Sequence, residues 1–123
     1  MSTALIIEDN EDNQVLITIL LENSGYQVIK ADTGEGGCRL AIEQEPDFIL
    51  LDIQLPDCDG TEVLQRLRTT TATRNITIIA VTSHAMVGDD AVLIAAGCDG
   101  YIEKPIDPER IIQQIQMILD KCK

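Results

Sequence analysis

The 123-residue chain contains 45% hydrophobic residues, enough to fill the core of one ordinary domain but not of two. Its 21 acidic and 9 basic residues give a formal charge of -12. A charge of this sign repels the phosphates of nucleic acids and of anionic lipids, so direct binding to DNA or to a membrane surface is not expected.

The sequence shows no segment of the kind that targets or anchors a protein to a membrane. No apolar stretch approaches the roughly 20 residues that cross a bilayer. The first residues lead straight into an apolar run that is too short for a signal peptide, so we expect a cytoplasmic protein. Four cysteines lie far apart, without the paired spacing of a zinc site, and reduced thiols fit this compartment.

The first predicted strand, residues 4–7, is followed by an amphipathic helical pattern. Asn10 is suited to cap the amino end of this helix, and Gly25 is suited to end it. At a period of 3.6 residues, its buried face is predicted to be formed by Leu16, Ile19 and Leu20.

The second predicted strand, residues 27–31, leads into a helix that opens with Gly34, Gly36 and Gly37. Each glycine inside a helix costs about 1 kcal/mol relative to alanine, so we expect the first turn to fray. The third predicted strand, residues 48–51, is the most continuously apolar one, which indicates a central position in a sheet.

Two further strands are predicted at residues 76–81 and 100–102. In the last helix, Asp107 is expected to cap the amino end and Pro108 to occupy the first turn. An apolar stripe follows at Ile111, Ile115, Ile118 and Cys122. Strands and helices thus alternate five times, which predicts one α/β domain over residues 1–123, a doubly wound parallel sheet with helices on both faces.

A helical segment between the last two strands is unusually apolar. If Leu93 and Ala96 face the sheet, the helical period turns Val92, Ala95 and either Ala91 or Ile94 outward. Scattered surface aliphatics need no explanation, but a contiguous patch usually marks a contact surface. Our hypothesis is that this patch, beside the fifth strand and last helix, binds a protein partner or a second copy of the domain.

Reactive side chains follow the carboxyl ends of four predicted strands, the edge at which open α/β sheets bind ligands. They are Glu8 and Asp9 after the first strand, Asp52 after the third, Thr82 at the end of the fourth and Lys104 after the fifth. Taken singly, each has an ordinary explanation as a cap, a solvated charge or a strand residue. Their joint placement indicates a site.

Three carboxylates in a small space repel one another, and a hard divalent cation with oxygen ligands relieves that repulsion. Mg²⁺ fits because it binds few carboxylates and keeps waters and phosphate oxygens as its other ligands. An aspartate such as Asp52 can attack a phosphoryl donor to form an acyl phosphate. Lys104 can hold the carboxylate or the new phosphoryl group, and Thr82 can donate a hydrogen bond to it.

Four ordered segments resemble the response-regulator receiver family along essentially the whole chain. They are residues 5–10, residues 51–56 with Asp59 and Gly60, residues 80–83 and residues 100–105. The resemblance implies the CheY-like, flavodoxin-like fold: five parallel strands in the order 2-1-3-4-5 with five helices. It also suggests the stand-alone, single-domain regulators of the CheY and DivK type.

The resemblance implies a role for each matching residue. Asp52 would be the phosphoacceptor; Asp9 would bind Mg²⁺ directly, Glu8 through water, and the Gln54 backbone carbonyl would complete the protein ligands. Lys104 would bind the phosphoryl group, and Thr82 and Tyr101 would form a switch pair. The variable positions that tune the lifetime of the phosphoryl group are here Gln54 and His84.

The function implied is that of a response regulator in two-component or phosphorelay signalling. A sensor histidine kinase or a histidine phosphotransfer protein would supply the phosphoryl group. A downstream protein would bind the face formed by the fourth helix, fifth strand and fifth helix, with Val92, Ile94 and Tyr101 as contacts. Such a domain is not an enzyme, except that it catalyses its own phosphorylation and dephosphorylation.

Two alternatives remain on the residues alone. A phosphatase of the haloacid dehalogenase type also uses an Asp nucleophile with Mg²⁺, but needs a second Asp where this chain has Gln54, and a cap domain for which the chain is too short. A flavodoxin-like electron carrier needs a Ser-, Thr- and Gly-rich phosphate loop after the first strand, where Glu8 and Asp9 would repel a flavin phosphate.

Overall fold

The computed structural model describes residues 2–55, 57, 59–82 and 94–121. The elements are β1 (Thr3–Ile7), α1 (Glu11–Asn23), β2 (Gln27–Ala31), α2 (Gly34–Gln44), β3 (Phe48–Asp52), α3 (Gly60–Thr69), β4 (Thr77–Thr82), β5 (Gly100–Glu103) and α5 (Ile111–Lys121). Residues 94–96 form a further helical turn, and the rest of the apolar helix predicted before β5 lies outside the described residues.

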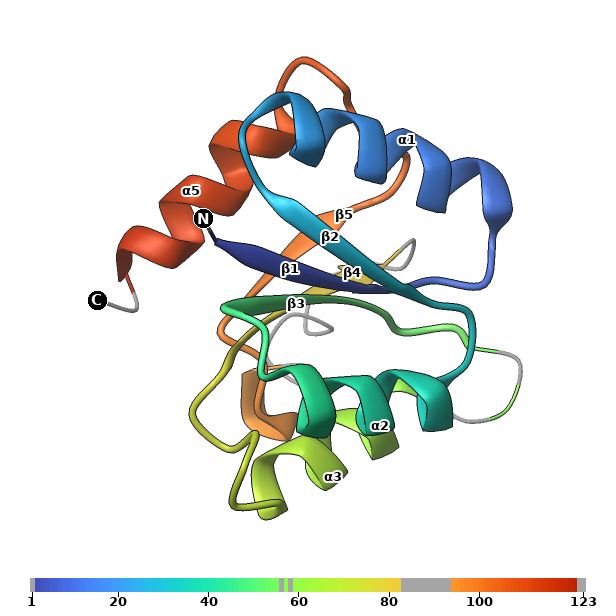
Figure 1. Cartoon of the computed structure of the whole chain (residues 1–123), viewed down its shortest axis with the longest axis vertical. Helices are drawn as coiled ribbons and strands as arrows, with labels where there is room; N and C mark the ends of the chain where they lie inside the picture. Colours follow the sequence, from blue (N-terminus) through green and yellow to red (C-terminus); the bar gives the residue numbers. More distant parts are fainter. Residues whose placement is uncertain (1, 56, 58, 83–93, 122–123) are drawn as a thin grey trace.

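The five strands form one parallel sheet in the order β2-β1-β3-β4-β5, which confirms the fold class. Helices α1 and α5 cover one face, and α2 and α3 cover the other (Figure 1). The chain first moves outward from β1 to β2 and then returns past β1 to β3. The strand order therefore reverses between β1 and β3, which is where doubly wound sheets bind ligands.

Each face of the sheet has its own apolar core, because successive residues of a strand point to opposite faces. Leu5 of β1 and Ile49 of β3 pack under α2 and α3. Their neighbours Ile6 and Leu50 pack on the other side, under α1 and α5. All five residues of β3 are buried, as expected for a central strand with helices on both faces.

Helix α1 begins and ends where the sequence predicts. The Asn10 side chain accepts a hydrogen bond from the Asn13 N–H, and Gly25 follows the helix with a φ of 93°, a conformation that suits glycine. The predicted buried face is wrong at one position, because Ile19 is 51% exposed while Ile17 and Leu21 are buried. The stripe is rotated relative to the one inferred from Leu16, Ile19 and Leu20.

The predicted fraying of α2 is not supported. Thr33 caps the helix by accepting the Gly36 N–H, and the Asp57 carboxylate accepts two further N–H groups of the first turn. Gly37 also has a packing role, since a Cβ atom there would lie 2.4 Å from Cδ1 of Ile7. Gly37 therefore allows α2 to approach β1 closely.

Helix α5 starts later than predicted. Asp107 accepts the Glu109 N–H through its side chain, but Pro108 lies in a turn that precedes the regular helix at Ile111. Ile111 and Ile115 are buried as predicted. Cys122, the last member of the predicted stripe, lies outside the described residues.

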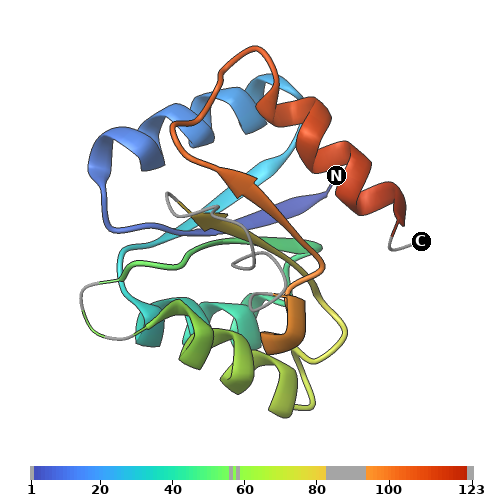
Figure 2. The same ribbon diagram turned by 180° about the vertical axis from the view of Figure 1, so that it is seen from behind.

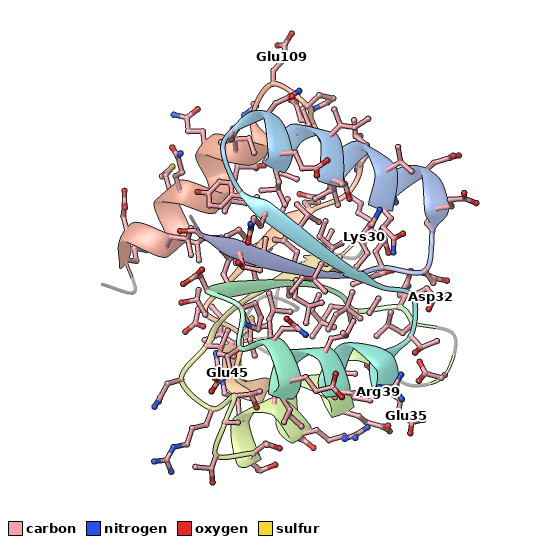
Figure 3. All side chains as sticks on the ribbon, in the orientation of Figure 1. Lys30, Asp32, Glu35, Arg39, Glu45 and Glu109 are labelled. Carbon is pink, nitrogen blue, oxygen red and sulfur yellow. The ribbon has the colours of Figure 1, made fainter. Side chains whose placement is uncertain are left out.

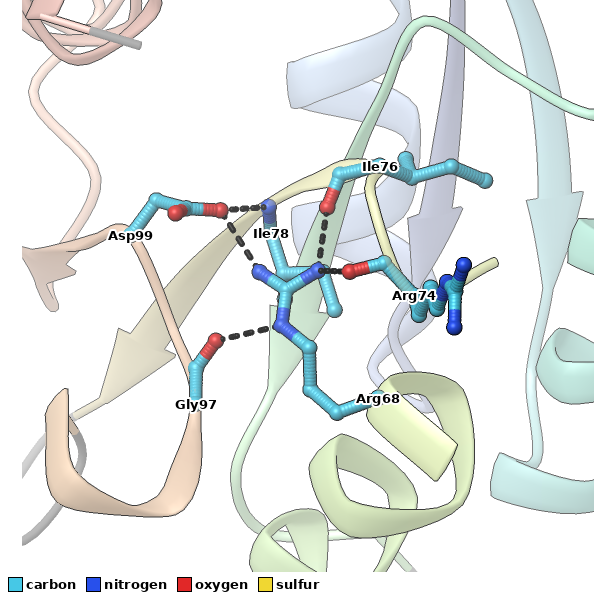
Figure 4. A network of polar contacts seen from close by, with 6 residues as sticks. All are labelled: Arg68, Arg74, Ile76, Ile78, Gly97 and Asp99. Carbon is cyan, nitrogen blue, oxygen red and sulfur yellow. Dashed lines mark hydrogen bonds and ion pairs between the residues drawn. The ribbon is translucent and has the colours of Figure 1, made fainter. Parts of the chain in front are cut away.

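One arginine fixes the edge of the sheet opposite the strand ends that hold the reactive residues. The Arg68 guanidinium donates to the carbonyls of Gly97, Arg74 and Ile76 at 2.8, 2.9 and 2.6 Å (Figure 4). It also pairs with Asp99 at 2.7 Å, and Asp99 accepts the Ile78 N–H. Arg68 thus joins the end of α3 to the beginnings of β4 and β5.

Among the helices built from the described residues, none is both long and apolar enough to cross a membrane.

Candidate functional site

Parallel pairing brings the carboxyl ends of four strands to the same edge of the sheet. Glu8 and Asp9 follow β1, Asp52 ends β3, Thr82 ends β4 and Lys104 directly follows β5. Oxygen atoms from the three carboxylates of Glu8, Asp9 and Asp52 all lie within 4.8 Å of one another. The structure thus brings together the acidic residues that the sequence singled out.

Lys104 lies between two of these carboxylates. Its Nζ is 3.2 Å from Oε1 of Glu8 and 3.3 Å from Oδ2 of Asp52. The backbone holds the lysine at this place, since the Lys104 N–H donates to the Thr82 carbonyl at 2.7 Å. The end of β4 therefore positions an ammonium group that faces the buried carboxylates.

Hydrogen bonds from neighbouring segments also fix the backbone around the carboxylates. The Glu8 N–H donates to the Ala31 carbonyl at 3.0 Å, and the Gln14 side chain on α1 donates to the Glu8 carbonyl at 3.1 Å. On the other side, the Gln54 N–H donates to Oδ1 of Asp52 at 3.0 Å. The Asp52 carboxylate is thereby held between a backbone donor and the lysine.

Within the described part of the chain, Lys104 is the one cationic side chain that pairs with the buried carboxylates of the site. Glu8 and Asp52 are 2% and 3% exposed, whereas Asp9 is exposed. Among the described residues, no group donates a hydrogen bond to either carboxylate oxygen of Glu8, although Oε1 faces the lysine. Buried polar atoms without donors are costly, which makes these oxygens fitting partners for a cation.

The pKa of Asp52 also reflects the burial and crowding of negative charge at the site. Burial, followed by the neighbouring Glu8, raises the pKa of Asp52 from 3.8 to about 6, against smaller opposing effects of the Gln54 N–H and Lys104. A divalent cation would oppose both main causes of this rise. The three clustered carboxylates supply the kind of oxygen ligands that a hard cation such as Mg²⁺ takes.

The two predicted switch residues lie on adjacent strands. Tyr101 pairs with Ala80, two residues before Thr82 on β4, so the alternation of side chains places Tyr101 and Thr82 on the same face of the sheet. Thr82 is buried and Tyr101 is 38% exposed. Their positions are compatible with the predicted pair, and their roles remain predictions.

Some predicted residues fall outside the described part of the chain. These are His84, the predicted tuning position, and Val92, a predicted partner contact. Ile94, the neighbouring partner contact, is 54% exposed.

Two residues at the site were not predicted from the sequence. Gln14 holds the Glu8 carbonyl, and Asp57 joins the loop after Asp52 to the first turn of α2. Asp57 has no local sequence signal, because only the fold brings it near α2. Gln14 lies six positions after Glu8, but no motif marks its side chain as the donor to that carbonyl.

The strand order and the acidic carboxyl edge with its lysine define a doubly wound α/β domain of the CheY-like kind. Residues 4–116 match the family model of the response regulator receiver domain, and the chain belongs to that family. It is 44% identical over 117 residues to the polar-differentiation response regulator DivK of Brucella ovis, covering 95% of each chain.

Solved structures agree with this assignment. The receiver domain of the sensor histidine kinase PA1611 from Pseudomonas aeruginosa PAO1 is 32% identical, with a TM-score of 0.87 over 97% of this chain and 98% of that one. That structure has a magnesium ion coordinated in its active-site cleft. The chemotaxis regulator CheY4 of Vibrio cholerae, 23% identical with a TM-score of 0.91 over 96% and 98% of the two chains, confirms the fold.

The chain is thus a receiver domain homologous to DivK, with a CheY-like fold, and belongs to a family that works in two-component phosphorelay signalling. Receiver domains are signalling proteins rather than classical enzymes. The alternative of a haloacid dehalogenase-type phosphatase is not supported.

Proposed function

We propose that this domain is a phosphorylation switch in which Asp52 accepts a phosphoryl group and Mg²⁺ is the required cation. The observation that carries the proposal is the placement of Lys104, whose Nζ lies 3.2 and 3.3 Å from the carboxylates of Glu8 and Asp52. An aspartate nucleophile beside a mobile ammonium group and a cation-binding carboxylate set is suited to phosphoryl transfer.

The cation would be held by Asp9 directly, by Glu8 through water, by Asp52 and by the Gln54 backbone carbonyl. When bound, Mg²⁺ neutralises charge on the carboxylates and on the phosphoryl oxygens. Two features support this assignment: the Glu8 oxygens accept no hydrogen bond from the described residues, and the pKa of Asp52 is raised.

In the transfer step, a carboxylate oxygen of Asp52 forms a bond to phosphorus while the bond from phosphorus to the donor breaks. With a phosphohistidine donor, the electron pair of the broken bond returns to the imidazole nitrogen, and the product is an acyl phosphate on Asp52. Lys104 then holds a phosphoryl oxygen in place of the carboxylate. The Thr82 hydroxyl donates a hydrogen bond to another phosphoryl oxygen, and Tyr101 turns inward beside it.

The partners follow from the same proposal. A sensor histidine kinase or a histidine phosphotransfer protein supplies the phosphoryl group, and Gln54 and His84 tune how long it stays. The signal is passed on through the face that carries Val92, Ile94 and Tyr101, either to a downstream protein or to a second copy of the domain. The exposure of Ile94 and Tyr101 supports this face.

Incubation with acetyl phosphate tests the switch. We expect intact mass spectrometry to find one phosphoryl adduct on the wild type with Mg²⁺, and none after chelation of the cation or in Asp52→Asn. Lys104→Ala should bind the cation but accumulate the adduct far more slowly. An adduct of equal yield without Mg²⁺, or in Asp52→Asn, would refute the proposal.

The partner face is tested separately. Ile94→Glu should weaken self-association or target binding in sedimentation experiments while leaving the adduct yield unchanged. Unaltered association would show that this face is not the contact surface.

A further inference from the structure

Asp57 joins the loop after β3 to the beginning of α2. Its two carboxylate oxygens accept the N–H groups of Gly34 and Glu35 at 2.9 and 3.1 Å. These residues are more than twenty positions apart in the chain, so the fold creates this contact. The same loop begins at Asp52, the proposed phosphoacceptor.

The first turn of α2 depends on bonds from outside the helix. The first N–H groups of any helix have no partner within it. Thr33 accepts the Gly36 N–H through its side chain and the Gly37 N–H through its carbonyl. The N–H groups of Gly34 and Glu35 donate instead to the Asp57 carboxylate. Glycines at this turn also weaken its intrinsic helical preference. Asp57 is therefore a main determinant of the position of this turn.

The other end of the loop is fixed at the site. The Gln54 N–H donates to Oδ1 of Asp52 at 3.0 Å, and Gln54 forms an antiparallel bridge with Asp59. The Gly60 N–H donates to the Ile53 carbonyl at 2.9 Å, which closes the loop at its base. The loop is thus held beside the Asp52 carboxylate at one end and tied to α2 at Asp57.

We propose that Asp57 is a positioning residue for the cation site. By tying the loop to α2, it holds the Gln54 backbone where its carbonyl completes the ligands of the cation, and it couples α2 to occupancy of the site. This inference rests on the proposed function, since it takes Gln54 as a ligand. Coupling of this kind is reciprocal. If the bonds of Asp57 to α2 raise the affinity of the site for the cation, cation binding stabilises those bonds, and with them the first turn of α2, by the same free energy.

A binding experiment with Mn²⁺ as the probe tests this role, because free Mn²⁺ is counted directly by electron paramagnetic resonance. Residues that orient metal ligands typically change metal affinity by about 10–100-fold, and Asp57 acts one step further away. We therefore expect Asp57→Ala to weaken Mn²⁺ binding roughly 3–10-fold. Asp57→Asn, which keeps one oxygen acceptor, should fall between it and the wild type.

Glu35→Gln is the matched control for charge. Glu35 is an exposed acidic residue on the same turn of α2, with its side chain directed away from the body of the domain (Figure 3). The substitution removes one negative charge from this region and leaves the backbone N–H groups bonded to Asp57. We expect Glu35→Gln to bind Mn²⁺ like the wild type.

Amide hydrogen exchange supplies a second readout. If Asp57 only capped the helix, the exchange rates of the amides it binds would not depend on Mg²⁺. In the wild type, Mg²⁺ should slow the exchange of the Gly34 and Glu35 amides. In Asp57→Ala these amides should exchange at rates that do not respond to Mg²⁺. If Asp57→Ala proves unfolded, Asp57→Asn decides by the same two measurements.

Three outcomes would overturn the role of Asp57: unchanged Mn²⁺ affinity in folded Asp57→Ala, an equal loss in Glu35→Gln, or amides that ignore Mg²⁺ in the wild type. Failure of the wild type itself to bind Mn²⁺ or Mg²⁺ is a different result. It would refute the cation site of the proposed function, and the role of Asp57 with it.

Discussion

Asp52 combines a buried position with the charge that its proposed chemistry requires. Burial is the main reason that its pKa rises to about 6, and the carboxylate of Glu8 adds to the rise. In the folded, metal-free protein Asp52 therefore binds a proton more tightly than in the unfolded chain. Its ionisation costs stability: the loss begins as pH rises above 3.8 and is complete above about 6.

The substitution Asp52→Asn removes this cost. In the presence of a chelator at pH 8, we expect the variant to be more stable than the wild type by about 1–3 kcal/mol. Urea denaturation across a pH series should show the difference shrinking as pH falls from 6 towards 3.8. A difference that stays constant across this range, or a less stable variant at pH 8, would contradict this account of the buried charge.

At the scale of single residues, the sequence was sufficient to find the reactive groups but not their supports. Glu8, Asp9, Asp52, Thr82 and Lys104 follow strand ends, and parallel strand ends share one edge, so their proximity was predictable. Asp57 was not predictable, because its bonds reach α2 more than twenty positions away. Gln14 lies only six positions from Glu8, but nothing in the sequence marks its amide as the partner of that carbonyl. A carboxylate in a loop, or an amide on a helix, carries no mark of the backbone group it will meet.

At the scale of the elements, close packing against β1 outweighs helix propensity in determining which residue is tolerated at position 37 of α2. An alanine at position 37 would favour an isolated helix by about 1 kcal/mol over glycine. Here its Cβ atom would lie 2.4 Å from Cδ1 of the fully buried Ile7. We expect Gly37→Ala to lower the free energy of unfolding by about 1–2 kcal/mol, because overpacking outweighs the helical gain.

Thermal unfolding of the double variant Gly37→Ala with Ile7→Val checks this explanation. Ile7→Val removes the methyl group nearest the new Cβ atom, so the double variant should be more stable than the sum of the two single effects predicts. Purely additive effects would show that the clash is not the cause.

Arg68 offers a second prediction for the elements. Its guanidinium satisfies three backbone carbonyls and one carboxylate, so Arg68→Ala should cost about 2–4 kcal/mol. Arg66→Ala, which removes an exposed arginine from the same helix, should cost less than about 0.5 kcal/mol. Chemical denaturation compares the two, and equal losses would mean that the network of Arg68 adds little.

The helices also show where periodicity is a weak guide. The limits of α1 were predictable from Asn10 and Gly25, whose cap and left-handed conformations are local properties. The buried face was misassigned at Ile19, because α1 carries apolar residues on more than one side. Which side is buried depends on how the helix packs on the sheet. The regularity of the first turn of α2 depends on Asp57, which lies in a different loop.

At the scale of the whole molecule, a charge of -12 means that any added salt relieves repulsion. Binding of Mg²⁺ at the site should stabilise the fold beyond this general effect. At ten times its Kd, Mg²⁺ adds about 1.4 kcal/mol by linkage, or about 5 °C in Tm for a domain of this size. Differential scanning fluorimetry measures the shift.

NaCl at equal ionic strength separates screening from binding. It should give a smaller shift than Mg²⁺, and Asp9→Asn should respond to both salts alike because it lacks a direct ligand. An equal response of the wild type to both salts would mean that Mg²⁺ acts only by screening.

The identity of the phosphorylated residue is the most direct test of the proposed switch. Reduction of the phosphorylated protein with borohydride converts an aspartyl phosphate to homoserine, and peptide mass spectrometry then locates the changed residue. We predict homoserine at position 52 and nowhere else, in protein treated with acetyl phosphate and Mg²⁺. A label at Asp9 or another carboxylate, or a phosphoryl group that survives on His84 instead, would contradict the assignment of Asp52.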